Sequence, residues 1–202
     1  MCSSDLIAHF DRASARAAGM ELWQLAENKP TALVFGGSQG ARHLNEVVAA
    51  AAPELIKAGY QILHSVGRNN SDHLVTGLPG YVTVPYIERM DFAYGVAAVA
   101  VTRAGAMTVA ELTAVGLPAV YVPLPIGNGE QKLNAEPVVS AGGGVIVDDA
   151  NFTAEVLIET LSRWKAEGFD KRSQAAAGCG RINDIETFVS IILAAAQSKG
   201  QS

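Results

Sequence analysis

The 202-residue chain is poor in charged residues and cysteine, has no basic excess, and each shortage argues against a class of protein. Charged residues make up 17% of the sequence and the net charge is −5, whereas a dedicated nucleic-acid binder usually carries a basic stripe. Two cysteines, Cys2 and Cys179, cannot build a disulfide framework, so a reducing compartment is expected. The sequence shows no signal peptide, and no apolar run reaches the roughly 18 residues of a membrane span. We therefore expect a soluble cytoplasmic protein with no nucleic-acid partner.

Apolar residues, by contrast, make up 49% of the chain and fall into short continuous runs between helical segments. This arrangement is typical of a parallel sheet covered by helices on both faces, and it predicts an α/β fold with a doubly wound, Rossmann-like sheet. The helix predicted over 41–58 contains Pro53, a residue that favours a break there. Strands are predicted at residues 31–35, 60–66, 81–85, 97–102, 118–122 and 144–147. Helices are predicted at residues 9–20, 41–58, 89–95, 106–115, 130–141, 153–165 and 181–197.

The most informative segment is a glycine-rich loop that follows the first predicted strand. Gly36, Gly37 and Gly40 let the backbone turn tightly, and Ser38 adds a hydroxyl donor. The helix that starts near Ala41 offers unpaired N–H groups and the positive end of its dipole to an anion. The loop lacks the Lys-Ser/Thr ending of a P-loop and the G-x-G-x-x-G spacing of a dinucleotide fold. A phosphate or diphosphate is the expected ligand, and a strand-to-helix turn without a ligand is the alternative.

Ligands of doubly wound sheets bind beyond the carboxyl ends of the strands, and two further loops there carry suitable residues. After the third strand, Tyr86, Ile87 and Met90 suit a flat base, or else pack the loop onto the core. After the fourth strand, Gly105 opens a second helix whose N-terminus can point at phosphate. Glu111, in the second turn of that helix, can accept hydrogen bonds from both ribose hydroxyls, or else is an ordinary surface carboxylate.

The loop after the fifth strand is rich in proline and glycine and ends in Glu130, Gln131 and Asn134 at a helix start. Such side chains suit sugar hydroxyls, which need both donors and acceptors, although a polar first helical turn is the alternative. Each loop alone is ambiguous. Together they predict two phosphate-facing helix ends, a base platform, a ribose carboxylate and a sugar-facing amide pair, which is a nucleotide-sugar site.

Residues 36–42 (GGSQGAR), 103–111, 116–119 and 130–135 closely resemble the MurG family of GT-B glycosyltransferases. The resemblance implies that residues 30–198 are the C-terminal, UDP-GlcNAc-binding half of a GT-B fold. It implies an enzyme of peptidoglycan biosynthesis, which transfers N-acetylglucosamine from UDP-GlcNAc to lipid I and makes lipid II. Residues 1–29 are expected to be a poorly patterned extension. Part of this extension is expected to be an artefact, because its first six residues resemble translated sequencing adapter.

The same resemblance assigns a role to individual residues. Ser38 would contact the diphosphate, the Ile87 backbone would bind the uracil edge, and Met90 would cover the base. Ala106, Met107 and Thr108 would lie along the phosphates, and Glu111 would bind the ribose. Gln131 and Asn134 would contact the GlcNAc hydroxyls. Two residues depart from the family pattern, since Glu130 stands where some members have Gln and Ala104 where many have Ser.

The family's acceptor half, which carries the lipid-facing surface and the general base, is not expected within this chain. We therefore predict no catalytic residue, metal or cofactor here, and no lipid I transfer by the fragment alone. Membrane contact would be peripheral, on the cytoplasmic side, and mainly through the other half. His64 and His73 are expected to be structural or surface residues. The alternatives are another GT-B transferase, a UDP-GlcNAc epimerase fragment, or a stand-alone nucleotide-sugar-binding module.

Overall fold

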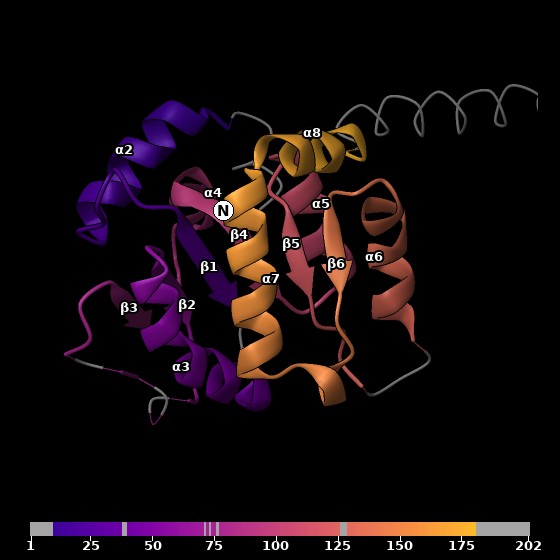
Figure 1. Ribbon diagram of the computed structural model, residues 1–202. Helices are drawn as coiled ribbons and strands as arrows, with labels where there is room; N and C mark the ends of the chain where they lie inside the picture. The colour runs from indigo at the N-terminus through magenta and orange to yellow at the C-terminus, as the bar shows by residue number, and fades with distance from the viewer. Residues whose placement is uncertain are drawn as a thin grey trace, which may run out of the picture.

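A computed structural model describes residues 10–37, 40–70, 72, 74–75, 77–125 and 129–180. Six strands form one sheet in the order β3-β2-β1-β4-β5-β6, and every pair of neighbours is parallel (Figure 1). The predicted doubly wound, Rossmann-like fold is therefore confirmed, and each strand lies within one of the predicted segments. The strands are β1 (Thr31–Phe35), β2 (Gln61–Ser65), β3 (Tyr81–Val84), β4 (Ala97–Thr102), β5 (Ala119–Tyr121) and β6 (Gly144–Ile146).

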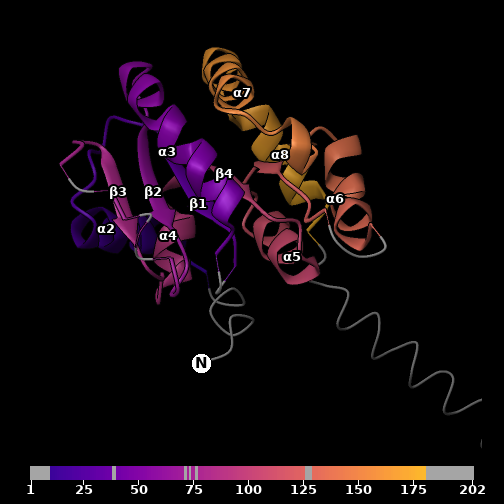
Figure 2. The same ribbon diagram turned by 90° about the horizontal axis from the view of Figure 1, so that it is seen from below.

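Helices cover both faces of this sheet. On one face lie α3 (Arg42–Lys57) and α7 (Ala154–Glu167), and on the other lie α4 (Met90–Val96) and α5 (Ala106–Ala114) (Figures 1 and 2). The core on the second face also takes buried residues from α2 (Arg12–Leu22), α6 (Glu130–Ser140) and α8 (Asp170–Gly178). A short 3-10 helix, η2 (Asp149–Asn151), precedes α7.

Strand β1 shows why the apolar runs are continuous. All five of its residues are buried, and successive side chains point to opposite faces of the sheet. Leu33 and Phe35 pack into the core under α4 and α5, whereas Ala32 and Val34 pack into the core under α3 and α7. A strand with two covered faces has no position for an outward polar residue, so its sequence does not alternate.

Helix α2 packs onto α4 through two glycines. A Cβ on Gly95 would lie 2.6 Å from the Arg16 backbone nitrogen, and one on Gly19 would lie 2.8 Å from the Phe92 carbonyl oxygen. The two helices therefore approach more closely than larger residues would allow. This contact makes residues 12–22 part of the packed body, although their sequence pattern is weak.

Two arginines of α2 reach the ends of neighbouring helices. Arg12 donates to the carbonyl of Val115, at the C-terminus of α5, and Arg16 donates to the carbonyl of Val96, the last residue of α4. Guanidinium groups at these positions satisfy carbonyls that have no partner within their helices, and they favour the negative end of each helix dipole.

Two α-helices differ from the sequence-based expectation. Helix α3 continues through Pro53 without ending, and Pro53 is exposed, so the carbonyl that loses its partner can bind water. Helix α8 was not expected, because its nine residues are mostly polar and form no apolar stripe. In the structure only Ala176 of this helix is buried. The predicted helix at 181–197 lies outside the described residues.

Candidate functional site

The strand order reverses between β1 and β4, which are neighbours at the centre of the sheet. Beyond their carboxyl ends lie the loop before α3 and the loop before α5. At such a reversal, the loops that follow the two strands run to opposite faces of the sheet. Ligands of doubly wound sheets bind in the crevice between these two loops. The sheet therefore brings together the two loops in which phosphate contacts are predicted.

The glycine loop after β1 is held tightly against β2. Gly40 has φ +76°, and a Cβ there would lie 2.1 Å from the carbonyl oxygen of Val66, so no larger residue fits. Gly36 is also tightly packed, since its Cβ would lie 2.5 Å from that of Ala41, whereas the Cβ of Gly37 would meet nothing within 4 Å. The predicted diphosphate contact of Ser38 lies outside the described residues.

A buried polar network joins this loop to the sheet. Asn45, on the second turn of α3, donates to the carbonyl of Val66 at 2.9 Å, and its Oδ1 lies 3.0 Å from Nε2 of His64. The other ring nitrogen of His64 lies 2.7 Å from the hydroxyl of Tyr81, on β3. Asn45 and His64 are fully buried. His64 is therefore structural, as expected, and His73 lies outside the described residues.

Both helices at the reversal begin without a side-chain cap. The first hydrogen bond of α3 runs from Asn45 N to the Ala41 carbonyl, and that of α5 from Val109 N to the Gly105 carbonyl. The N–H groups of the first three residues in each helix thus have no partner within the helix, which suits an anion. In α5 these residues are Ala106, Met107 and Thr108, of which the first two are exposed and Thr108 is half-buried.

The loop between β3 and α4 has its apolar residues in different settings. The side chain of Ile87 is buried in the core, and Met90 is half-buried against the same core. Tyr86 is exposed at 36%, with the Arg68 guanidinium 4.1 Å from its ring centroid. Burial of the Ile87 side chain anchors the segment whose backbone is predicted to meet the base.

Glu111 lies half-buried on α5, at the face turned toward α4. Its Oε2 accepts a hydrogen bond of 2.6 Å from the hydroxyl of Tyr94. Burial, followed by the charge of Glu111, raises the pKa of Tyr94 far above its ordinary value. The sequence analysis missed this partner, because Tyr94 resembles any core aromatic residue until the tertiary structure places it.

Gln131 and Asn134, the predicted sugar-reading pair, both reach the backbone of Ala104. The Gln131 Oε1 accepts from the N–H groups of Ala104 and Leu124, at 3.1 and 3.0 Å, and Asn134 donates to the Ala104 carbonyl at 3.1 Å. The structure therefore joins α6 to the loop before α5. These contacts use one oxygen and one N–H of the pair, and the predicted contact with GlcNAc hydroxyls remains a prediction.

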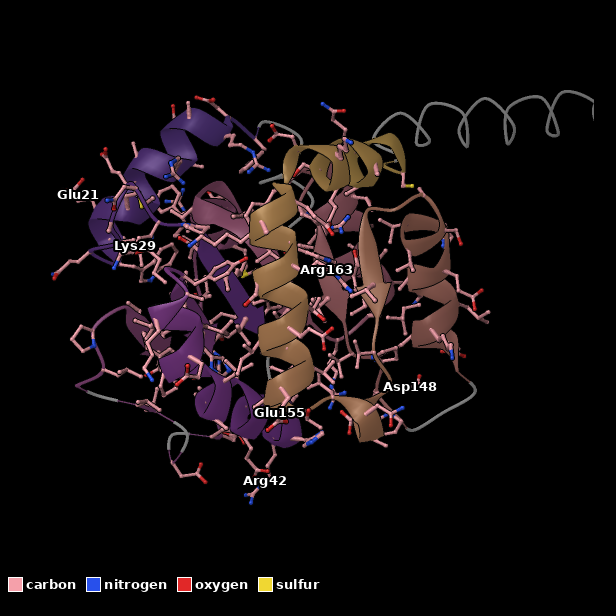
Figure 3. All side chains as sticks on the ribbon, in the orientation of Figure 1. Glu21, Lys29, Arg42, Asp148, Glu155 and Arg163 are labelled. Atoms are coloured by element: carbon pink, nitrogen blue, oxygen red, sulfur yellow. The ribbon has the colours of Figure 1, made fainter. Side chains whose placement is uncertain are left out.

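An ion network at the same edge was also missed. Arg103, the first residue after β4, donates to the Val122 carbonyl at 3.0 Å and to Oδ1 of Asp149 at 2.5 Å. Asp149 also lies 3.1 Å from Nδ1 of His43, on the first turn of α3. The network ties together the start of α3, the loop before α5 and the start of η2. Arg42, which precedes His43, projects into solvent at this end of the molecule (Figure 3).

Two kinds of feature are absent from the described part of the chain. None of its helices is long and apolar enough to cross a membrane. No three of its His, Cys, Asp or Glu side chains converge in a way that could hold a metal ion.

The sequence model of the family described as "Glycosyltransferase family 28 C-terminal domain" matches residues 31–185. The chain belongs to this family. The match begins at β1 and contains every strand of the sheet, together with all the predicted site residues. The family 28 domain thus coincides with the part of the chain in which the candidate site was found.

Relatives and solved structures agree with this membership and confirm the resemblance to the MurG family. A Streptomyces coelicolor protein named UDP-N-acetylglucosamine–N-acetylmuramyl-(pentapeptide) pyrophosphoryl-undecaprenol N-acetylglucosamine transferase is 50% identical, over 96% of this chain and 55% of its own length. A protein of the same name from Streptomyces avermitilis is 60% identical over 74% of this chain and 42% of its own length. The chain therefore spans about half the length of these relatives.

The crystal structure of Acinetobacter baumannii MurG matches 93% of this chain and 54% of its own chain, with a TM-score of 0.75 and 27% identity. The glycosyltransferase VinC, solved in complex with dTDP, matches with a TM-score of 0.64 and 18% identity over 88% of this chain and 44% of its own, which shows the fold alone. The family 28 domain has the Rossmann-like fold of one half of a GT-B glycosyltransferase.

Proposed function

We propose that this chain binds UDP-GlcNAc as the donor domain of a hexosyltransferase that makes lipid II. The observation that carries the proposal is the pair of uncapped helix N-termini, α3 and α5, at the reversal of strand order. Each offers three N–H donors and a positive dipole end to a diphosphate.

The nucleoside would extend from the phosphates toward α4. The backbone of Ile87 would meet the uracil edge, Met90 would cover the ring, and Glu111 would accept hydrogen bonds from the ribose hydroxyls. Main-chain contacts match a pyrimidine edge and leave purines with unpaired polar atoms, which cost about 1–3 kcal/mol each. Nucleoside selectivity therefore follows from a rigid segment whose side chain, Ile87, is buried.

The sugar would lie on the other side of the phosphates, beside the start of α6. Gln131 and Asn134 are already oriented by their hydrogen bonds to Ala104, so their amide groups present donors and an acceptor in fixed positions. Such preorganised amides would distinguish GlcNAc from sugars with another substitution pattern.

Transfer itself would require the remainder of the longer protein. The names of the Streptomyces relatives give N-acetylmuramyl-(pentapeptide) pyrophosphoryl-undecaprenol, which is lipid I, as the acceptor. We infer the same acceptor for the whole protein of which this chain is a part. Because this acceptor is borne by a lipid, we propose that the whole protein attaches peripherally to the membrane, on its cytoplasmic side.

Calorimetric titration of the chain with UDP-GlcNAc, UDP, UDP-glucose, ATP and NAD tests donor binding. We expect binding of the uridine nucleotides, a preference for UDP-GlcNAc over UDP-glucose, and no comparable binding of ATP or NAD. Equal affinity for ATP and UDP would refute the uracil assignment. Equal affinity for UDP-GlcNAc and UDP would refute the assignment of Gln131 and Asn134 to the GlcNAc hydroxyls.

A further inference from the structure

Tyr94 and Glu111 form a partly buried contact between two helices on the same face of the sheet. Tyr94 lies on α4 with 1% of its surface exposed, and its hydroxyl donates to Glu111 Oε2 at 2.6 Å. An O–H···O⁻ bond of this length is charge-assisted and is stronger than a bond between neutral groups. The contact therefore joins a residue of the core to the carboxylate at the site.

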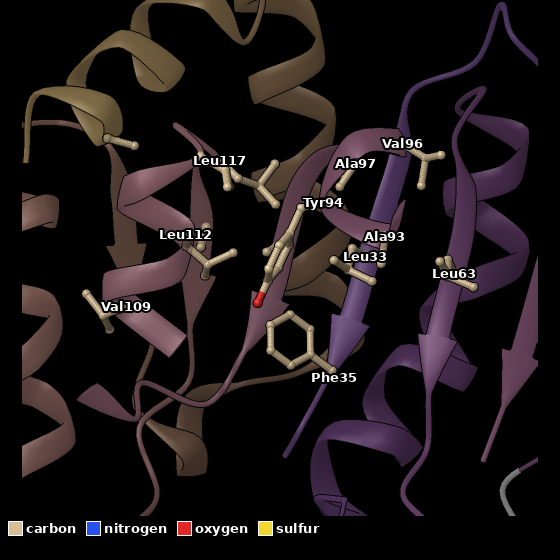
Figure 4. Close-up of a cluster of buried hydrophobic side chains, with 14 of the residues drawn as sticks. Leu33, Phe35, Leu63, Ala93, Tyr94, Val96, Ala97, Val109, Leu112 and Leu117 are labelled. Carbon is tan, nitrogen blue, oxygen red and sulfur yellow. The ribbon is translucent and has the colours of Figure 1, made fainter. Parts of the chain in front are cut away.

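The ring of Tyr94 is held firmly by its neighbours. It meets Phe35 edge-on, with 6.5 Å between ring centroids and 61° between the planes. Leu33 and Leu112 belong to the same buried cluster, and in Figure 4 the Tyr94 hydroxyl points toward the end of β1 at which Phe35 lies. Because packed aromatic rings do not reorient freely, the hydroxyl is a fixed reference point for Glu111.

A carboxylate can accept about four hydrogen bonds, so Glu111 can bind Tyr94 and a ligand at the same time. The Tyr94 hydroxyl stays protonated, because burial and the charge of Glu111 raise its pKa. It therefore always donates to the carboxylate and holds one of its oxygens in place. Without that bond, a glutamate side chain on a helix surface samples several rotamers.

We propose that Tyr94 is a positioning residue for ribose recognition, which aims the Glu111 carboxylate at a pair of vicinal hydroxyls. This inference rests on the proposed function, since it takes Glu111 as the residue that meets the ribose. The ligand class that it selects is a ribonucleoside diphosphate rather than its 2′-deoxy counterpart. Tyr94 does not touch the ligand and acts through Glu111.

Tyr94→Phe tests this role, because it removes one hydroxyl and keeps the ring. UDP and 2′-deoxy-UDP are titrated by calorimetry against the unaltered chain and the variant. We expect the unaltered chain to prefer UDP, and the variant to lose about fivefold or more in affinity for UDP but less than about twofold for 2′-deoxy-UDP. A loss of packing alone would weaken both ligands equally.

Tyr121→Phe is the matched control. Tyr121 belongs to the same buried cluster, and its hydroxyl has no hydrogen-bond partner among the described residues. This variant should leave both affinities unchanged. In a chain that already carries Glu111→Ala, Tyr94→Phe should have no further effect on the preference for UDP.

Glu111→Asp is a second test, which does not depend on the folding of the Tyr94 variant. It keeps the charge but shortens the side chain by one methylene, so one carboxylate cannot reach both Tyr94 and the ribose, and the preference for UDP should fall. Full retention of that preference in either Tyr94→Phe or Glu111→Asp overturns the positioning role. A failure of the unaltered chain to bind UDP overturns the proposed function itself, and binding without any ribose preference overturns the assignment of Glu111.

Discussion

The Oδ1 atom of Asn45 lies 3.0 Å from Nε2 of His64, and both side chains are fully buried. This pair joins the second turn of α3 to β2, while the Asn45 amide donates to the carbonyl of Val66, against which Gly40 packs. The position of the glycine loop therefore depends on polar side chains in the core, where unpaired groups are costly.

Asn45→Ala should lower the free energy of unfolding by about 2–4 kcal/mol, because it leaves the Val66 carbonyl and a His64 nitrogen without this partner in the core. Urea denaturation followed by circular dichroism measures the change. Glu46→Ala, at the exposed neighbouring position, is the control and should change stability by no more than about 0.5 kcal/mol. Equal stability of the two variants would show that the network contributes little.

Gly40→Ala and Gly37→Ala form a pair that separates steric fit from backbone conformation. Both residues have positive φ, but only at Gly40 would a Cβ collide with the Val66 carbonyl. Gly37→Ala should cost about 1 kcal/mol of backbone strain, and Gly40→Ala about 3 kcal/mol or more, with reduced binding of UDP. Thermal unfolding and UDP titration of both variants check this, and equal costs would mean that the loop shifts to admit the methyl group.

Glu111→Ala should weaken UDP binding by about 1.5–3 kcal/mol, since it removes a charge-assisted contact with the ribose. The fold should be retained at a cost of about 1–3 kcal/mol, because the variant leaves the buried Tyr94 hydroxyl without this partner. Calorimetry measures the affinity, with Glu159→Ala, an exposed residue of α7 on the opposite face, as the control. Unchanged UDP affinity would contradict the ribose assignment.

The chain should bind UDP-GlcNAc without forming lipid II from lipid I. Transfer needs the acceptor hydroxyl close to the anomeric carbon and a base within hydrogen-bond reach of it, and the resemblance to the MurG family implies that these groups come from the other half of a GT-B fold. A lipid II assay with the purified chain, alone and with a separately produced N-terminal half from a relative, measures the difference. Robust transfer by the 202-residue chain alone would require a catalytic residue within it.

The sheet could be predicted, and the candidate site could be proposed at one edge of it, because both depend on local patterns. A strand buried on two faces must be apolar throughout, and parallel strands bring the loops that follow them to one edge. The positions of Gly36, Gly37 and Gly40 after β1, and of Glu111 on α5, therefore carried the argument before any contact was known. The glycosyltransferase assignment also needed the longer GGSQGAR segment, because a glycine-rich turn alone is compatible with no ligand.

Only the tertiary structure decided which side chains meet one another. Tyr94 and Glu111 lie on different helices, and Arg103 and Asp149 are 46 residues apart in the chain. No periodicity encodes such pairs, since each depends on how two elements pack onto the same sheet. Helix α8 was not predicted for the same reason. Its nine residues are mostly polar, and the helix packs against the core through one buried alanine, Ala176. Local hydrophobic pattern determined the elements and their order, and packing between distant segments determined the orientation of the polar groups at the site.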